Sequence, residues 1–255
     1  MSSCFKTDAY TPPDQTLTGK IIDSSTGLPI QSESGGIQIK ENQLDWNGTG
    51  AVSVSPDQNL MVKFDGTYND TKVFKGKYKL VPIGGAFVPP YRTSPAPAID
   101  KSVTVDIQGG TTTVNFTVDP FLKVEWVGEP VINGDKTVSA SFKFTRGTAD
   151  PVFQFPVTDA TLYISTTPFV SSADQDNNFT FNATTYNTPG SVPDPVTGKY
   201  PQSPITNFIG QTITLTSKLP LLADRTYYIR GAARTADNVN KRYNYNVAKA
   251  VYMPQ

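Results

Sequence analysis

Residues 17–30 read Leu-Thr-Gly-Lys-Ile-Ile-Asp-Ser-Ser-Thr-Gly-Leu-Pro-Ile, and this stretch decides the fold. Apolar and polar side chains alternate along its first half, which is typical of a strand with one buried face. Thr26-Gly27 then predicts a turn, and Pro29 favours a return in an extended conformation. The stretch therefore predicts a strand, a turn and a second extended segment.

The same alternation recurs through the first 120 residues, and helical periodicity is nearly absent. Further strands are predicted at residues 36–39, 60–64, 76–80, 102–107 and 113–118. Asp65-Gly66 supplies a turn that needs a positive φ angle, which glycine adopts readily. Regularly spaced short strands of this kind indicate an antiparallel β-sandwich, which we assign to residues 17–120.

A second series of strands follows directly after Asp119-Pro120. Its members are residues 122–127, 137–144, 160–165, 212–216, 226–230 and 247–252. Trp126 alternates with Leu122 and Val124, so we expect it to pack in a core. Residues 121–255 are therefore predicted to form a second antiparallel sandwich, and the fold class is all-β with two sandwiches in tandem.

Composition excludes most kinds of active site. The chain has 22 basic and 22 acidic residues, no histidine and a single cysteine. A cancelled charge does not recruit nucleic acid, and without histidine the Ser-His and Cys-His nucleophiles are excluded. Carboxylate-pair, lysine and tyrosine chemistry remain open in principle, but no motif supports any of them. We therefore expect a protein that is not an enzyme and has no cofactor.

Cys4 is the strongest functional signal near the start of the chain. It follows two serines, as at the end of a bacterial lipobox, where the cysteine thiol is diacylated. The apolar part of a signal peptide does not precede it here, so we expect the natural chain to begin further upstream. Residues 1–16 then form a tether, and the protein meets the membrane only through its lipid. The alternative is a free thiol near a frayed end.

Two predicted loops of the first domain contain aromatic residues that could face a ligand. Trp46 lies in a polar, glycine-flanked stretch, where its ring could stack on a sugar or could plug the end of the sandwich. Phe87, Tyr91 and Arg92 lie in a proline-rich loop that lowers the entropy cost of presenting them. That loop could equally cover an edge strand.

The second domain has one long segment without a strand signal, from Tyr186 to Pro204. A loop of this size in a compact domain is either functional or a solvated insertion. Tyr186 and Tyr200 are therefore candidate glycan-binding residues.

Asp174, Asp176 and Asn178 place oxygen atoms at alternate positions, as at the start of a calcium loop. Phe179 stands where such a loop needs its glycine, and Thr185 stands where it needs a glutamate. We therefore predict no metal site, with these three residues as the only calcium candidates.

Two motif sets resemble known domain families. The stretch of residues 17–30, with Asp65–Tyr68 and Phe74–Leu80, resembles the carboxypeptidase regulatory-like domain, which is a prealbumin-like sandwich without catalytic residues. The stretch of residues 221–233 is similar to the late strands of fibronectin type III and related Ig-like domains. There a tyrosine hydroxyl, here that of Tyr227, ties a corner back to the backbone.

The chain as a whole resembles a Bacteroidetes surface lipoprotein family of unknown function. The resemblance rests on the segments Cys4–Tyr10, Leu17–Asp23, Asp65–Tyr68, Gly76–Tyr78, Thr166–Ser171 and Arg242–Tyr245. Such proteins occur with starch-utilisation-type outer-membrane transporters and their glycan-binding lipoprotein partners. The resemblance implies an outer-membrane, cell-surface location and supplies no ligand.

Two functions follow from these observations. The first is a glycan-binding accessory that holds oligosaccharides near a transporter. The second is a structural or interaction subunit that docks on a transporter complex and binds no glycan itself.

Overall fold

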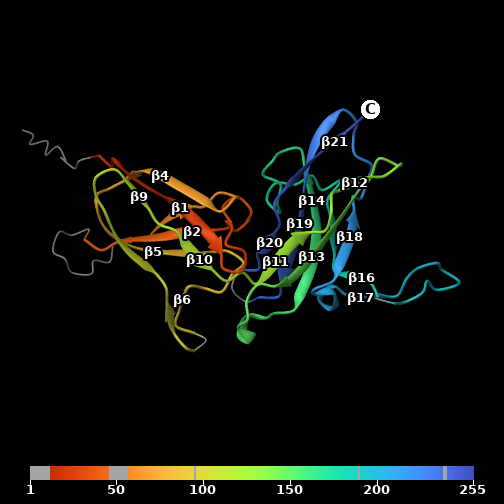
Figure 1. Ribbon diagram of the computed structural model, residues 1–255, viewed down its shortest axis with the longest axis horizontal. Helices are drawn as coiled ribbons and strands as arrows, with labels where there is room; N and C mark the ends of the chain where they lie inside the picture. Colours follow the sequence, from red (N-terminus) through yellow and green to blue (C-terminus); the bar gives the residue numbers. More distant parts are fainter. Residues whose placement is uncertain (1–11, 46–56, 95, 189, 238–239) are drawn as a thin grey trace, which may run out of the picture.

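The computed structural model describes residues 12–45, 57–94, 96–188, 190–237 and 240–255. Its regular structure consists of strands and two short 3-10 turns, which confirms the all-β prediction. Two groups of sheets lie side by side in Figure 1, with the N-terminal group on the left and the C-terminal group on the right. Each group encloses a core of its own, one within residues 17–118 and the other within residues 122–253.

The first domain consists of two four-stranded sheets. One has the order β10-β1-β4, with β9 also pairing to β1, and its strands are β1 (Gln15–Asp23), β4 (Thr67–Val73), β9 (Thr111–Thr113) and β10 (Phe116–Val118). The other has the order β3-β2-β5-β8, formed by β2 (Gln38–Gln43), β3 (Gln58–Met61), β5 (Gly76–Ile83) and β8 (Val103–Ile107). Most pairs are antiparallel, but β1 pairs in parallel with both β9 and β10.

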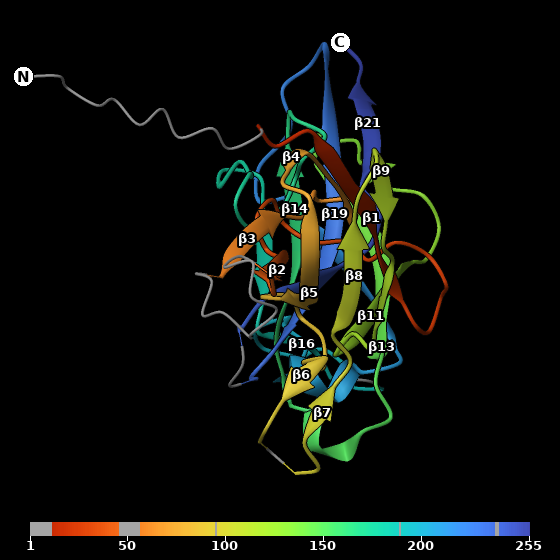
Figure 2. The same ribbon diagram turned by 90° about the vertical axis from the view of Figure 1, so that its left-hand side faces the viewer.

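The opening stretch of sequence forms the centre of the first of these sheets. Leu17 and Ile21 of β1 are fully buried, so the alternation of the sequence matches the two faces of the strand. Beyond the two sheets, β6 (Tyr91–Arg92) and β7 (Ile99–Asp100) form a separate hairpin, which projects at the bottom of Figure 2.

The second domain packs a four-stranded sheet against a five-stranded one. The first contains β11 (Leu122–Trp126), β12 (Val131–Ile132), β13 (Val138–Arg146) and β18 (Thr212–Thr216). The second contains β14 (Val157–Ser165), β15 (Phe181–Ala183), β19 (Arg225–Thr235), β20 (Tyr243–Tyr245) and β21 (Lys249–Met253). The 3-10 turns η1 (Pro151–Phe153) and η2 (Ile205–Phe208) complete the domain.

Two aromatic residues singled out in the sequence, Tyr227 and Trp126, pack against the core of this domain. Tyr227 is fully buried, and its hydroxyl accepts a hydrogen bond of 3.1 Å from the backbone N–H of Leu222, as expected for a corner tyrosine. Trp126 is partly buried against the core, and its indole N–H donates to the backbone oxygen of Val247 at 2.7 Å.

The prediction that Tyr186 to Pro204 contains no strand was wrong. A two-stranded ribbon of β16 (Thr185–Asn187) and β17 (Gln202–Pro204) closes both ends of this segment. The pairs are Thr185 with Pro204, Tyr186 with Ser203 and Asn187 with Gln202. The strands are too short to show an alternation in the sequence, and prolines between them hid the pairing.

Candidate functional site

The outer face of the five-stranded sheet carries a cluster of aromatic residues. Tyr163, Tyr243 and Tyr245 pack together there, with ring centroids 5.4–5.9 Å apart. Burial raises the pKa of the Tyr245 hydroxyl far above its usual range, so this group stays neutral. The cluster therefore presents both apolar ring faces and neutral hydroxyl groups to neighbouring parts of the chain.

Arg230 of β19 extends from this cluster to the first domain. Its guanidinium is buried and lies 4.4 Å from the ring centre of Tyr245. It donates to the backbone oxygens of Asn246 (2.7 Å), Ser32 (2.9 Å) and Val170 (3.3 Å) and to the side-chain oxygen of Gln31 (3.1 Å). Two of these four acceptors belong to the first domain. Burial lowers the pKa of Arg230 to about 10, so the group remains cationic at neutral pH.

Other bonds join the domains nearby. Arg242 forms an ion pair of 2.8 Å with the buried carboxylate of Glu33. Asn240 and Asn244 donate side-chain hydrogen bonds to the backbone oxygens of Gly85 (3.2 Å) and Ala86 (2.9 Å). The segment Arg242–Tyr245, which marks the family resemblance in the sequence, is thus part of the domain interface.

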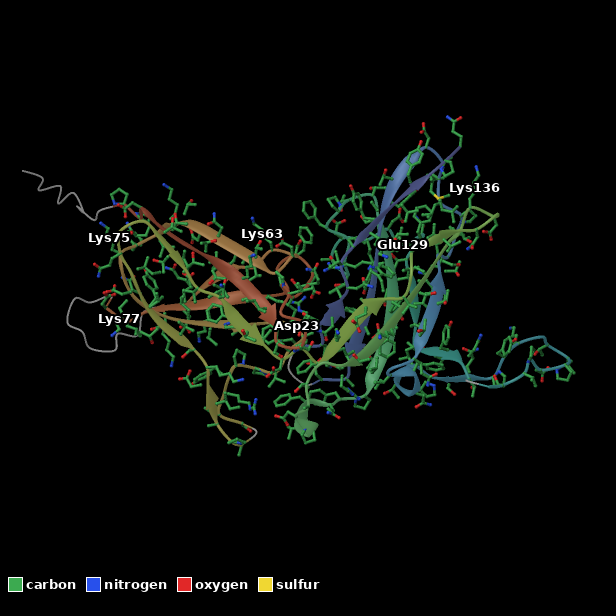
Figure 3. All side chains as sticks on the ribbon, viewed as in Figure 1. Asp23, Lys63, Lys75, Lys77, Glu129 and Lys136 are labelled. Atoms are coloured by element: carbon green, nitrogen blue, oxygen red, sulfur yellow. The ribbon has the colours of Figure 1, made fainter. Side chains whose placement is uncertain are left out.

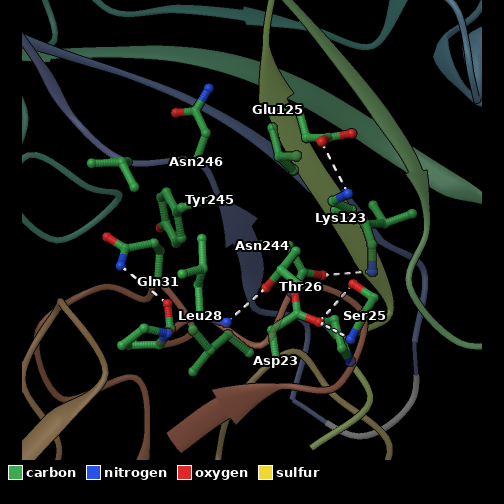
Figure 4. A pocket seen from close by; sticks show the side chains of 16 residues that line it. Asp23, Ser25, Thr26, Leu28, Gln31, Lys123, Glu125, Asn244, Tyr245 and Asn246 are labelled. Carbon is green, nitrogen blue, oxygen red and sulfur yellow. Dashed lines mark hydrogen bonds and ion pairs between the residues drawn. The ribbon is translucent and has the colours of Figure 1, made fainter. Parts of the chain in front are cut away.

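A cleft of about 500 Å³ lies beside this interface. Figure 4 shows its walls, with Leu28 and Gln31 contributed by the first domain and Lys123, Glu125 and Asn246 by the second. Clefts between domains are frequent ligand sites.

Most polar groups of this cleft already have partners within the protein. Lys123 and Glu125 form an ion pair of 2.9 Å. Gln31 accepts from Arg230, and Asn244 accepts from the backbone of Leu122 at 3.0 Å. The cleft therefore offers few free groups to a ligand, and none of the described residues that line it is an exposed aromatic one.

A groove of about 520 Å³ lies on the second domain, where β15 and the β16–β17 ribbon approach the edge strand β18. Its lining combines aromatic rings, hydroxyl groups, amides and one ammonium group. These residues are Phe181, Thr185, Tyr186, Asn187, Gln202, Thr214, Thr216, Ser217 and Lys218, with Ala183 and Leu215 completing the lining. We call this surface the Phe181 groove.

The two rings of the Phe181 groove differ in how they are held. Tyr186 is fixed, because its hydroxyl accepts from the N–H of Thr214 (2.9 Å) and donates to the oxygen of the same residue (3.1 Å). Phe181 has 37% of its surface exposed. Beside them, the Gln202 amide donates to the Asn187 oxygen at 2.8 Å, which leaves the Asn187 N–H groups and the Gln202 oxygen available. The groove thus has an open ring face beside unused amide groups.

Two residues predicted to face a ligand are instead buried, and the structure corrects both predictions. Phe87 is 2% exposed and belongs to the core of the first domain. Arg92 is 8% exposed, stacks 4.8 Å from the ring centre of Phe153 and lies 3.5 Å from the carboxylate of Asp150. Phe153 and Asp150 of the second domain pack against Arg92 and so cover this part of the loop.

The exposed tyrosines do not share one surface. Tyr91 is 51% exposed on the β6–β7 hairpin of the first domain, with Lys79 5.4 Å from its ring centre. Tyr200 is 43% exposed in the second domain and does not line the Phe181 groove. Of the predicted aromatic residues within the described chain, Tyr186 alone lies in a groove that also holds free polar groups. Cys4 and Trp46 lie outside the described residues.

The calcium candidates are engaged by their own loop. Asp174 accepts hydrogen bonds from the hydroxyls of Ser165 (3.3 Å) and Thr167 (2.8 Å). Asp176 accepts from the backbone N–H of Asn178 at 2.9 Å, which is the bond of an Asx-turn. Within the described part of the chain, no three acidic or cysteine side chains gather in a way that could hold a metal ion.

Phe181, Asn187 and Gln202 were not predicted as site residues from the sequence. Their segments carry aromatic and polar residues of the kind a sugar site uses, but short strands do not reveal which face stays uncovered. In addition, none of the described helical segments has the length and apolar character needed to cross a membrane.

Comparison with known proteins shows that this fold is shared. The N-terminal domain of DUF3823, a protein of unknown function, matches residues 15–119. A crystal structure of a DUF3823 family protein from Bacteroides uniformis is 27% identical, with a TM-score of 0.75 over 95% of this chain and 100% of that one. None of the curated proteins matches.

Two further crystal structures resemble nearly the whole chain. One is of a Bacteroides uniformis protein described as a candidate carbohydrate binding protein, 19% identical, with a TM-score of 0.66 over 94% of this chain and 100% of that one. The other is of a DUF3823 family protein from Bacteroides ovatus, 19% identical, with a TM-score of 0.65 over 94% and 99%. The two-domain β architecture is therefore common to these chains.

Proposed function

We propose that this chain, whose first domain is similar to DUF3823, is a non-catalytic glycan-binding lipoprotein of the bacterial surface. An oligosaccharide binds in the Phe181 groove of the second domain. Cys4 carries the lipid anchor, and the first domain holds the binding domain away from the bilayer.

The composition of the Phe181 groove is the observation that carries this proposal. A sugar ring presents apolar C–H faces and a rim of hydroxyl groups, so it needs an aromatic surface next to hydrogen-bonding side chains. Phe181 supplies the open ring, and Asn187 and Gln202 supply a donor and an acceptor with unused capacity. The interdomain cleft has a similar size but lacks an exposed ring.

Weak binding suits an accessory of polysaccharide capture. Dissociation constants between about 1 mM and 1 μM need only ~4–8 kcal/mol, which a few stacking and amide contacts can provide. The candidate carbohydrate binding protein of Bacteroides uniformis has the same fold, which is consistent with this use. We further propose an outer-membrane transporter and its glycan-binding lipoprotein as neighbours at the surface.

We also propose that each domain is related to a known domain family. The strand orders β11-β13-β18 and β15-β14-β19-β21, together with the Tyr227 corner, support a fibronectin type III-like second domain. The sandwich around β1 supports a carboxypeptidase regulatory-like first domain. Both likenesses describe binding or spacer modules.

The proposal is tested with a panel of plant, host and microbial polysaccharides, first by affinity gel electrophoresis and then by calorimetry. We expect at least one glycan to bind with a dissociation constant in the micromolar to millimolar range. Phe181→Ala should then weaken binding about two- to twelvefold, since stacking on one ring is worth about 0.5–1.5 kcal/mol. Tyr186→Phe should weaken it less, because the ring remains.

Tyr91→Ala is the matched control, since it removes an exposed ring from the first domain. It should bind as the unaltered protein does. No binding across the panel would refute the glycan function, and a loss with Tyr91→Ala but not with Phe181→Ala would refute the assignment of the groove.

The second candidate function is a structural subunit that docks on the transporter complex without binding glycan. The hydrogen bonds of Arg230 to Gln31 and Ser32 favour it, because they hold the two domains in one relative orientation. Cross-linking of the surface-displayed protein, with and without added glycan, separates the two functions. A transporter contact that persists in a protein without glycan affinity would support docking.

A further inference from the structure

A hollow of about 620 Å³ lies on the first domain, on the face of β1 that is turned away from the core. Thr18 and Lys20 reach it, because they alternate with the buried Leu17 and Ile21. Its lining also includes Ile22, Gly27, Leu28, Pro29, Lys63, Thr67, Asn69, Thr113 and Asn115. We call it the lysine hollow.

Among its described lining residues, the lysine hollow has two ammonium groups and no carboxylate. Within the described chain, neither Lys20 nor Lys63 is part of an ion pair. The carboxylate of Asp65 is near Lys63 but accepts from the N–H (3.0 Å) and hydroxyl (2.7 Å) of Thr67. Neither lysine therefore has to break an ion pair to meet a negatively charged ligand, although Lys63 lies within the electrostatic reach of Asp65.

The remaining polar groups of the hollow also include free donors. The Asn115 oxygen accepts the backbone N–H of Lys20 at 3.0 Å, so its amide N–H groups are left to donate. Asn69 and Thr113 are exposed beside it. A ligand that satisfies this surface must be rich in acceptors and carry negative charge.

The hollow lies next to the interdomain cleft, since Leu28 and Pro29 line both. An isolated phosphate or acetate ion would occupy a small part of this space. An acidic oligosaccharide, which is larger and carries several charges, fills more of it.

We propose that the lysine hollow binds the carboxylate or sulfate groups of an acidic polysaccharide. This inference rests on the proposed glycan-binding function and adds a second site, on the other domain, that selects for charge. Net charge cannot supply this selection, because the acidic and basic residues of the whole chain cancel. The selection comes from two lysines that line one hollow, among whose described lining residues there is no carboxylate.

The test compares oligogalacturonate with the same oligosaccharide after methyl esterification, which removes its charge. The full chain should bind the charged form more tightly, and the difference should shrink as salt rises from 20 to 500 mM, since salt screens exposed charges. The double variant Lys20→Met/Lys63→Met should lower affinity for the charged form about fivefold and leave the esterified form unchanged.

A second double variant is the control, because it changes the net charge by the same amount as the first. Lys75→Met/Lys77→Met also removes two exposed lysines, and these lie at the far end of the first domain in Figure 3, away from Lys63. It should bind oligogalacturonate as the unaltered protein does. Equal losses in both double variants would show a general charge effect and overturn the assignment.

Two further arms identify the source of the anion. Inorganic sulfate that competes as well as oligogalacturonate does, at equal charge concentration, would show a small-anion site instead. Binding to vesicles of anionic phospholipid that depends on Lys20 and Lys63 and exceeds oligosaccharide binding would show a lipid site. Binding of neutral glycans lost in Phe181→Ala, with no preference for charge, would overturn this inference but leave the proposed function intact.

Discussion

Glu33 of the first domain and Arg242 of the second form an ion pair across the domain interface, with 2.8 Å between Oε1 and Nη1. The Glu33 side chain is 3% exposed, whereas that of Arg242 is 45% exposed. A carboxylate removed from water in this way needs a cation, and the second domain supplies it. The burial of one domain's charge therefore depends on the other domain being in place.

Arg242→Met should destabilise the protein by about 2 kcal/mol, because Glu33 then loses its ion-pair partner while it remains buried. Urea denaturation at pH 7 measures the change. Adding Glu33→Gln to this variant should restore part of the lost stability, since the uncompensated charge is removed. Arg225→Met, an exposed arginine on β19, should change stability by less than about 0.5 kcal/mol. Equal effects of the two arginine variants would contradict the interface argument.

Arg230→Met should loosen the orientation of the domains. The variant loses the bonds to Ser32 and Gln31, so fewer contacts oppose relative motion. Small-angle X-ray scattering should give a larger radius of gyration than for the unaltered protein, with Arg225→Met as control. An unchanged scattering profile would mean that the other interface bonds suffice.

Glu41 makes the stability of the first domain depend on pH. Burial, with a smaller effect of the Asp70 charge, raises the pKa of Glu41 from 4.5 to about 7. The folded state therefore favours the protonated carboxyl. Stability from this group is full below pH 4.5 and falls as the pH rises toward 7, because the unfolded chain ionises first.

Glu41→Gln should remove this dependence. A pKa rise of this size corresponds to about 3 kcal/mol, so the variant should be more stable than the unaltered protein by up to that amount at pH 8 and nearly equal at pH 4. Denaturation series at both pH values measure the difference. Glu129→Gln, whose side chain is 82% exposed, serves as control and should show no such trend.

Gly19→Ala should destabilise the first domain by at least about 3 kcal/mol. A Cβ atom there would lie 1.8 Å from the backbone oxygen of Val114 and 2.7 Å from the Tyr68 hydroxyl, which donates to that oxygen. Gly27→Ala is the comparison. It lies in open space with φ of 70°, so only the backbone conformation opposes the change, at about 1 kcal/mol. Thermal unfolding that ranked Gly27→Ala as the more damaging would contradict the close approach at β1.

The loops show why ligand-facing residues are hard to predict from a sequence. The proline-rich loop with Phe87 and Arg92 has the composition of an exposed segment, yet Phe87 lies in a core and Arg92 is covered by Phe153. Phe153 is 61 residues away along the chain, and no local pattern indicates that it will arrive there. The expected strand at 113–118 likewise breaks into β9 and β10, which both pair with β1.

The sequence by itself determined the all-β fold, because alternation with a period of two residues and turn-forming pairs act over a few neighbouring positions. The Tyr227 corner was expected from the resemblance of residues 221–233 to fibronectin type III domains. Only the tertiary structure decided where a ligand can bind. The Phe181 groove joins β15 and the β16–β17 ribbon to β18, and the lysine hollow joins Lys20 to Lys63. Such surfaces arise from pairings between distant segments. Which faces the packing leaves uncovered is therefore decided by the whole fold and not by any local stretch of sequence.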